Sequence, residues 1–302
     1  MSLEAGGIVV QNVSKTFAKK SVLNNISFFV GKGELFGFLG PNGAGKTTTM
    51  RIILALLEAD NGTVLIDGTS FHLDPSIRRR TGVLLEGHGL YEEMSLYDNI
   101  VYYAALYGMK VEQARGIIRR VGLASHSEEK VGTFSSGMKK RAALARALVH
   151  EPEYLFLDEP TTGLDPEAQI EFRELIGNLS RERGITLFLN SHNLDEVQKI
   201  CTNVAIISGG KILVSESLLK LQHKYGEPAV FITLYDDENA RRLEELLKQN
   251  DKVVRTGLSG RRVEAVLHKD NLTLQDVLTY GIEIKEFTVR VKSLEEVYMD
   301  IV

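Results

Sequence analysis

Cysteine is nearly absent from this sequence. Among 302 residues only Cys201 carries a thiol, which excludes an internal disulfide bond. Leu194, Val197 and Cys201 fall on one face of an expected helix, which indicates a small buried apolar residue rather than a redox centre. Residues 1–4 lead into no apolar segment typical of a secretion signal. No uncharged apolar run approaches the roughly 20 residues that cross a bilayer. The sequence therefore predicts a soluble, intracellular protein, and action at a membrane would need another chain.

An excess of either charge is also lacking. The 36 basic residues nearly balance the 40 acidic ones, so we expect no nucleic-acid partner. Hydrophobic residues make up 43% of the chain, which is enough to bury a full core. The length is compatible with one large domain or two.

Two kinds of periodicity divide most of the chain. Alternating apolar and polar residues predict early strands, and from about residue 94 helical spacing follows a capping-box pattern at Ser95–Asp98. Short apolar runs predict buried parallel strands, and Gly209-Gly210 predicts a hairpin turn. Asp165-Pro166 supplies a cap and a first-turn proline for another helix. The predicted strands are 8–17, 22–30, 34–39, 154–157, 186–189, 204–208 and 211–214, and the predicted helices include 111–121 and 135–149.

The pattern of predicted elements changes after about residue 220. Predicted elements follow in the order β-α-β-β-α-β, which is the ferredoxin-like split βαβ pattern. They are the strands 229–234, 252–256, 262–267 and 282–291 and the helices 239–249, 274–280 and, last, 293–301. We therefore expect two domains, at 8–220 and 221–302, the second a small α+β domain.

A glycine-rich loop lies between a predicted strand, 35–39, and a predicted helix, 48–57. It matches the pattern G-x-x-x-x-G-K-[ST], in which backbone N–H groups and the helix N-terminus surround a phosphate. Lys46 would contact the β- and γ-phosphates, and the Thr47 hydroxyl could ligate Mg²⁺. The predicted nucleotide-binding residues of this loop are Gly40, Pro41, Asn42, Gly43, Ala44, Gly45, Lys46, Thr47 and Thr48.

Two carboxylates follow the apolar run 154–157, where ligands bind in doubly wound sheets. Asp158 suits a position on the metal side, binding Mg²⁺ directly or through water. Glu159 could polarise the attacking water, because in-line displacement needs a positioned base opposite the leaving group. An acidic strand end that caps a helix is the alternative, and the upstream phosphate loop makes it the weaker reading.

These motifs, over roughly residues 8–215, resemble those of the ABC ATPases. Phe134-Ser135-Ser136-Gly137-Met138 is similar to the signature motif, Thr161–Asp165 to the D-loop and His192 to the switch histidine. Phe17 resembles the aromatic that stacks on adenine, and Glu86 stands where the family has its Q-loop glutamine, a possible metal ligand. The resemblance implies an α/β P-loop NTPase of ABC ATPase type, with antiparallel β and α-helical subdomains.

The resemblance also implies how such a chain works. Ser135 and Gly137 would bind the γ-phosphate held by a second copy, giving a homodimer around ATP, with Glu159 and His192 catalytic. The tail Ser293–Tyr298 is similar to single-cassette drug-export subunits. ATP and Mg²⁺ would be the cofactors. A separate transmembrane subunit would hold the chain at the inner face of the cell membrane.

The residues themselves leave simpler readings open. Ser135 could be only a helix cap, His192 a surface or core histidine, and Phe17 a core residue. In the segment 87–99, apolar side chains could form a socket for a partner helix or pack on themselves; these are Leu90, Tyr91, Met94 and Leu96. A ribosome- or DNA-associated ABC protein and a non-catalytic sensor are the competing functions.

Three residues depart from the family pattern. Glu86 adds a negative charge near the metal and Lys46, Ser136 replaces a signature glycine, and Met138 replaces the signature glutamine. A Cβ at Ser136 would crowd the backbone near the phosphate. We therefore expect intact ATP binding with slow hydrolysis.

Overall fold

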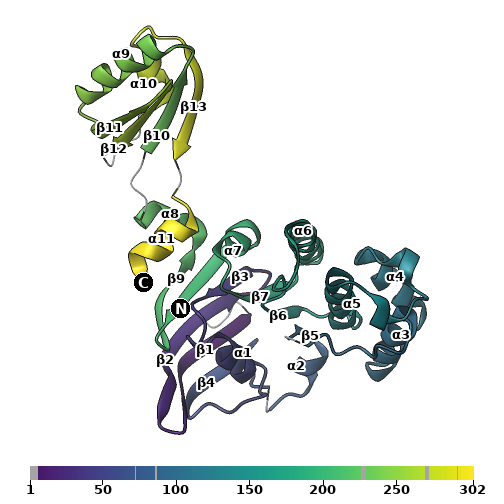
Figure 1. Ribbon diagram of the computed structural model, residues 1–302. Coiled ribbons are helices and arrows are strands. Elements are labelled where there is room, and N and C mark those ends of the chain that lie inside the picture. The colour runs from purple at the N-terminus through teal and green to yellow at the C-terminus, as the bar shows by residue number, and fades with distance from the viewer. Residues whose placement is uncertain (1–5, 72, 86, 226–228, 269–271, 291) are drawn as a thin grey trace. The chain divides into compact units, whose positions relative to one another are not determined.

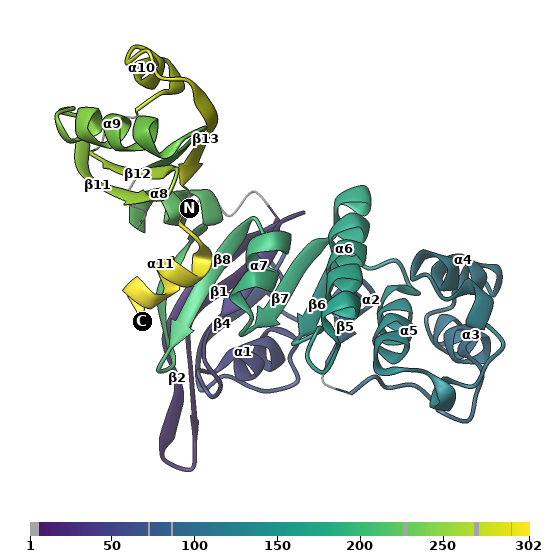
Figure 2. The same cartoon turned by 45° about the horizontal axis from the view of Figure 1, so that its top comes forward.

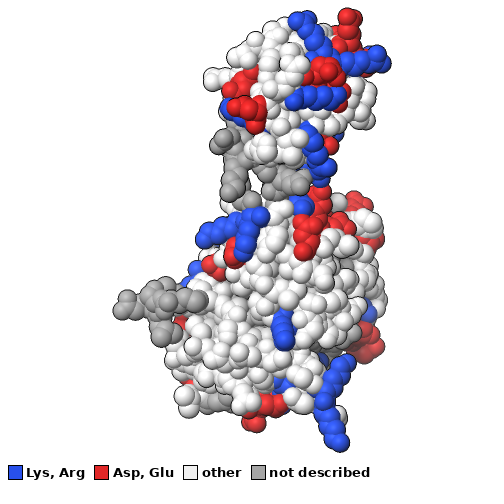
Figure 3. Space-filling view, turned by 90° about the vertical axis from the view of Figure 1, so that its left-hand side faces the viewer, with Lys and Arg blue, Asp and Glu red and all other residues white. Residues whose placement is uncertain are grey.

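The computed structural model describes residues 6–302 except 72, 86, 226–228, 269–271 and 291, and leaves out the side chain of residue 223. The chain divides into two compact units: unit 1 ends at Ser217, and unit 2 begins at Leu218. Each unit has its own sheets and helices (Figure 1). On the face of unit 2 shown in Figure 3, acidic and basic side chains lie next to one another.

A six-stranded sheet forms the centre of unit 1, in the order β5-β6-β7-β3-β8-β9. All neighbours run parallel except the hairpin β8–β9. The central strands are buried along their whole length, as expected for parallel strands covered on both faces. The strands are β3 (Leu35–Leu39), β5 (Thr81–Leu84), β6 (Tyr154–Asp158), β7 (Thr186–Ser191), β8 (Asn203–Ser208) and β9 (Lys211–Ser217).

A second sheet in unit 1 is antiparallel, in the order β2-β1-β4. Its strands are β1 (Gly7–Phe17), β2 (Lys20–Gly31) and β4 (Asn61–Ile66). Figures 1 and 2 place this sheet and α1 (Lys46–Ile53) on one side of the six-stranded sheet. On the other side lie α6 (Pro166–Arg183) and α7 (Leu194–Ile200).

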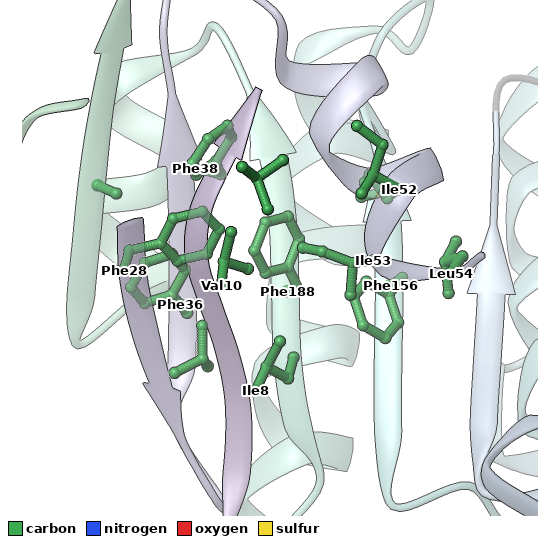
Figure 4. Packing of buried hydrophobic residues seen from close by; sticks show 14 of the residues in the cluster. Ile8, Val10, Phe28, Phe36, Phe38, Ile52, Ile53, Leu54, Phe156 and Phe188 are labelled. Atoms are coloured by element: carbon green, nitrogen blue, oxygen red, sulfur yellow. The ribbon is translucent and has the colours of Figure 1, made fainter. Parts of the chain in front are cut away.

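An aromatic core joins the two sheets (Figure 4). Phe188 of β7 lies between rings from β2, β3 and β6, with centroids 5.5 Å from Phe38 and Phe156 and 5.7 Å from Phe36. Such offset contacts add to the large area that each ring buries. The core therefore fixes β3, β6 and β7, whose carboxyl ends carry the candidate site.

The remaining helices of unit 1 lie mostly in one helical region. There α3, α4 and α5 pack against one another. Ser95 caps α3 by accepting a hydrogen bond from the Asp98 amide, as the sequence predicts. The bounds are α2 (Ser76–Arg79), α3 (Leu96–Leu106), α4 (Glu112–Arg120) and α5 (Ser136–Leu148), with 3₁₀ turns η1 (Ala124–His126) and η2 (Val131–Thr133).

An ion-pair cluster connects the start of β6 to the antiparallel sheet. Arg80 donates to Glu153 from Nε (2.7 Å) and Nη2 (3.0 Å) and also pairs with Asp67. Asp67 in turn accepts from the Tyr154 hydroxyl at 2.6 Å. Hydrogen bonds from Arg80 and then Lys32 lower the pKa of Glu153 to about 2.

The lowered pKa predicts a pH dependence of stability. A carboxylate whose pKa falls on folding stabilises the fold above its unfolded value of 4.5, and this contribution is lost as the pH falls towards about 2. We expect Glu153→Gln to unfold at lower urea concentration at neutral pH, and the gap to the unmodified chain to narrow across that window. Glu128→Gln, at an exposed ion pair, should leave the urea midpoint unchanged. A gap that stays constant with pH would contradict the assignment.

Unit 2 contains a four-stranded antiparallel sheet in the order β11-β12-β10-β13. Buried residues of β10 and β12, such as Ile232 and Val263, pack with Leu243 of α9. The chain order β10-α9-β11-β12-α10-β13 is the predicted split βαβ pattern. Its elements are α8 (Leu218–Tyr225), β10 (Ala229–Leu234), α9 (Asp237–Lys248), β11 (Val253–Ser259), β12 (Arg262–Leu267), α10 (Leu274–Leu278), β13 (Ile284–Arg290) and α11 (Leu294–Ile301).

Several elements were not predicted. The periodicity analysis missed β4, β5, α2 and α8, which are short or half exposed. The helix expected at 48–57 begins at Lys46 and ends at Ile53, because Leu54 leaves the helical region and Ala55 has a φ of 52°. Cys201 is buried, as predicted, and burial raises its pKa well above the usual range.

Candidate nucleotide-binding site

The glycine-rich loop connects β3 to α1, as predicted. Gly45 has a φ of 111°, and a Cβ there would lie 2.5 Å from Leu23 Cδ2. A Cβ on Gly40 would lie 2.3 Å from the carbonyl oxygen of Ile207. Glycine is therefore required at both positions, which permits the tight turn before the helix N-terminus.

Lys46 begins α1 and lies inside this turn. Only 7% of the residue is exposed, and Nζ donates to the Gly40 carbonyl at 2.8 Å. The same Nζ lies 3.4 Å from Glu159 Oε1. The loop therefore carries a nearly buried cation at the point where a bound phosphate would need neutralising.

Asp158 ends β6 next to the loop. Its Oδ1 accepts from Thr47 Oγ1 at 3.4 Å and from Asn190 Nδ2 at 3.0 Å. The register of β6 and β7 sets Asp158 opposite Asn190. A carboxylate and a hydroxyl side by side are oxygen ligands of the kind Mg²⁺ prefers, so Thr47 and Asp158 fit a metal site. The third predicted ligand, Glu86, lies outside the described residues.

Glu159 links the loop to the end of β7. Its backbone adopts a φ of 48°, and its amide donates to the Asn190 carbonyl at 3.0 Å. Glu159 Oε2 lies 2.7 Å from His192 Nδ1. Positive φ is uncommon for a residue with a side chain, and it occurs here at a residue predicted to be catalytic. The structure thus brings together Lys46, Asp158, Glu159 and His192, which the sequence places far apart.

Ser135 and Gly137 belong to a different part of unit 1, at the start of α5. Ser135 Oγ accepts from the Met138 amide at 3.2 Å, so the capping role that the sequence left open is real. Among the described residues, no hydrogen bond or ion pair joins Ser135 or Gly137 to the glycine-rich loop. The exposed Ser135 at a helix N-terminus could still bind an anion from outside the chain.

Phe17 ends β1 and is 44% exposed, which argues against a core role. Lys15 Nζ lies 5.5 Å from its ring centroid. An exposed ring of this kind offers a stacking surface for a base.

Sequence reasoning missed two residues that support the site. Asn190 is fully buried and contacts both Asp158 and Glu159. Glu196 accepts from Ser191 Oγ at 2.6 Å, next to His192; burial raises its pKa, and hydrogen bonds from Ser191 and then Thr161 oppose the rise. A polar residue ending a buried strand could have signalled Asn190. Nothing in the sequence indicated that Glu196 supports the site, because a glutamate on an expected helix is ordinarily interpreted as solvent-exposed.

Comparison with known proteins identifies the family. The family model described as ABC transporter matches residues 23–162. An uncharacterized ABC transporter ATP-binding protein of Bacillus subtilis, YhcH, is 34% identical over 295 residues, covering 96% of this chain and 94% of that protein. The chain belongs to the ATP-binding proteins of ABC transporters.

Two further similarities extend this assignment. A Nod factor export ATP-binding protein of Burkholderia lata is 38% identical over 209 residues, covering 67% of each chain. The solved structure of an ATP-binding subunit of an ABC transporter has a TM-score of 0.65 and 29% identity, covering 73% of this chain and 93% of that one. This ABC protein is thus an α/β ATPase that binds and hydrolyses ATP. Among its described helices, none has the length and apolar character to cross a membrane.

Proposed function

We propose that this ABC protein forms a homodimer around ATP and powers a separate transmembrane subunit, acting as an exporter. Thr47 and Asp158 would hold Mg²⁺, which would neutralise phosphate charge, and Glu86 is proposed as a further ligand. The two contacts of Glu159, at 3.4 Å with Lys46 and at 2.7 Å with His192, carry this proposal. The export-protein relative supports the direction of transport.

The side chains divide the work of hydrolysis. The residues from Gly40 to Thr48 would hold the phosphates, and Lys46 would neutralise their charge. Glu159 would accept a hydrogen bond from the attacking water, and His192 would orient Glu159 and contact the γ-phosphate. Ser135 and Gly137 of one protomer would bind the γ-phosphate held by its partner.

Replacing Lys46 by alanine tests the catalytic part. We expect the steady-state ATPase rate to fall at least about a hundredfold, because a nearly buried cation is removed from the phosphate site. Lys32→Ala, at an exposed ion pair of the same unit, is the matched control and should keep the rate. A wild-type rate no higher than that of Lys46→Ala would overturn the ATPase reading.

Phe17 allows a test of base stacking. We expect Phe17→Ala to weaken ATP binding about tenfold, since stacking on an aromatic ring contributes about 1–3 kcal/mol per base. Phe17→Tyr keeps the ring and should bind normally. Fluorescence titration with a labelled ATP analogue measures both affinities, and equal binding by all three proteins would remove Phe17 from the site.

A groove at the edge of the helical region supports a membrane partner. It encloses about 450 Å³ and includes Leu56, Phe71, Val83 and Tyr107 in its lining. Within residues 87–99, Leu90 and Leu96 are buried, which favours packing within the chain over a socket, while Tyr91 is exposed. We propose that a cytoplasmic helix of the transmembrane subunit binds in this groove, which would hold the chain at the inner face of the cell membrane.

The partner can be identified directly. Affinity purification of the tagged chain from detergent-solubilised native membranes should recover a polytopic membrane protein. Leu56→Glu, which places a charge on an exposed groove residue, should lose that protein but keep ATP binding. Recovery of ribosomes or DNA in place of a membrane protein would favour the competing class of ABC protein.

We further propose that 8–220 and 221–302 are separate domains. Deletion of the chain from Pro228 onward should therefore leave ATP binding intact.

A further inference from the structure

The strand β13 forms one edge of the unit 2 sheet and has a sequence that suits pairing with a second copy of itself. In the described part of unit 2, β13 pairs with β10 only and forms one edge of the sheet. Among the described elements of unit 2, Figures 1 and 2 show none beyond this edge. Edge strands that present their backbone to solvent can pair with another chain.

Side chains of β13 alternate between the two faces of the sheet. Glu286 pairs with Thr233 and Thr288 with Phe231 in β10, so Glu286, Thr288 and Arg290 share the face opposite the core that α9 covers. Phe287 and Val289 share the face that carries the unit 2 core, and Val289 is 61% exposed. Lys285 is the extra residue at an irregularity in the pairing and lies outside this alternation.

We propose that β13 pairs antiparallel with β13 of a second copy, centred on Thr288. This register sets Glu286 opposite Arg290 twice, and Phe287 opposite Val289 twice, with the two Thr288 residues facing each other. Opposite charges and apolar pairs directly across strands stabilise antiparallel sheets. Centring the pair on Phe287 would instead set Glu286 opposite Thr288 and Ile284 opposite Arg290.

Arg290 has the capacity for a further partner. It donates from Nη1 to Glu264 at 2.9 Å and from Nη2 to Glu296 at 2.6 Å. A guanidinium carries five N–H donors, so donors remain for Glu286 of the second copy. The pairing joins two unit 2 sheets and involves no residue of the nucleotide site, so it is independent of ATP and of the proposed function.

Cysteine cross-linking of the full chain without nucleotide tests the contact. Directly opposed residues of antiparallel strands have Cα atoms about 4.5–5.5 Å apart, within the range of a disulfide bond. We expect Thr288→Cys to form disulfide-linked dimers on mild oxidation. Lys285→Cys is exposed on the same strand, but its copies would be about 20 Å apart, so its yield should be about tenfold lower. The unmodified chain is the background, because Cys201 is buried.

Charge reversal gives a second test in the Thr288→Cys background. Glu286→Arg would set arginine opposite arginine, and Arg290→Glu would set glutamate opposite glutamate, so each alone should cross-link about tenfold less. A mixture of the two restores both opposite-charge pairs and should recover the dimer as a heterodimer, which also shows that both variants fold. Equal cross-linking at residues 285 and 288, none at Thr288→Cys, or a mixture of folded variants that fails to recover would overturn the proposal.

Discussion

Glu159→Gln is expected to lower the ATPase rate by about a hundredfold to ten-thousandfold while leaving ATP binding intact. The amide keeps the size of the side chain and its place beside Lys46 and His192 but cannot accept the proton of the attacking water. Hydrolysis would then fail after the dimer has closed around ATP. Size-exclusion chromatography with ATP should therefore show a dimer that persists.

A control separates the loss of the base from the loss of a charge. Glu167→Gln removes an exposed carboxylate in the first turn of α6 and should keep the rate. Glu159→Gln that hydrolyses ATP at the wild-type rate would remove Glu159 from catalysis. A variant that binds ATP but stays monomeric at every ATP concentration would count against the dimer.

Ser135→Asp should abolish ATP-dependent dimerisation without damaging the fold. Aspartate caps helices as well as serine, so α5 keeps its N-terminal hydrogen bond to the Met138 amide. Its charge would face the γ-phosphate of the partner's ATP and repel it. Ser135→Asn keeps the cap without the charge, and analytical ultracentrifugation should show that it still dimerises with ATP.

A mixing experiment tests whether each site is shared by two chains. Lys46→Ala removes one half of a site and Ser135→Asp the other, so each variant alone should be inactive. A mixed dimer would contain one site with both halves intact, and ATPase activity should return on mixing the two variants. Two outcomes would show that a single chain completes the site. One is normal dimerisation of Ser135→Asp with ATP, and the other is a mixture in which both variants fold and form mixed dimers but no ATPase activity returns.

The sequence predicted the chemistry of the site better than its geometry. The glycine-rich loop and the acidic pair were recognisable because each needs fixed residue types at short spacing, between a strand and a helix. The contact between Glu159 and His192 depends on β6 and β7 being neighbours, which no local pattern specifies. Asn190 was missed for the same reason, because the Asp158 carboxylate that it contacts lies on the neighbouring strand.

The limits of prediction follow the same logic in the fold. Long alternations such as residues 8–17 and the β-α-β-β-α-β order of unit 2 were predicted, because they repeat over many residues. Short elements such as β5 and α2 were missed, since four residues hold barely one helical turn and only two periods of strand alternation. The early end of α1 depends on the left-handed Ala55, which composition does not reveal.

The pairing of Asp158 with Asn190 has a consequence for how this gene can vary. Deleting one residue from β6 would turn Asp158 towards the opposite face of the sheet, because side chains alternate along a strand. A frame-preserving codon deletion in β6 should therefore be as damaging as loss of the carboxylate itself. A single-codon deletion at the exposed turn around Gly108 should have almost no effect on ATPase activity. A scan of single-codon deletions would therefore identify the strands that carry the site.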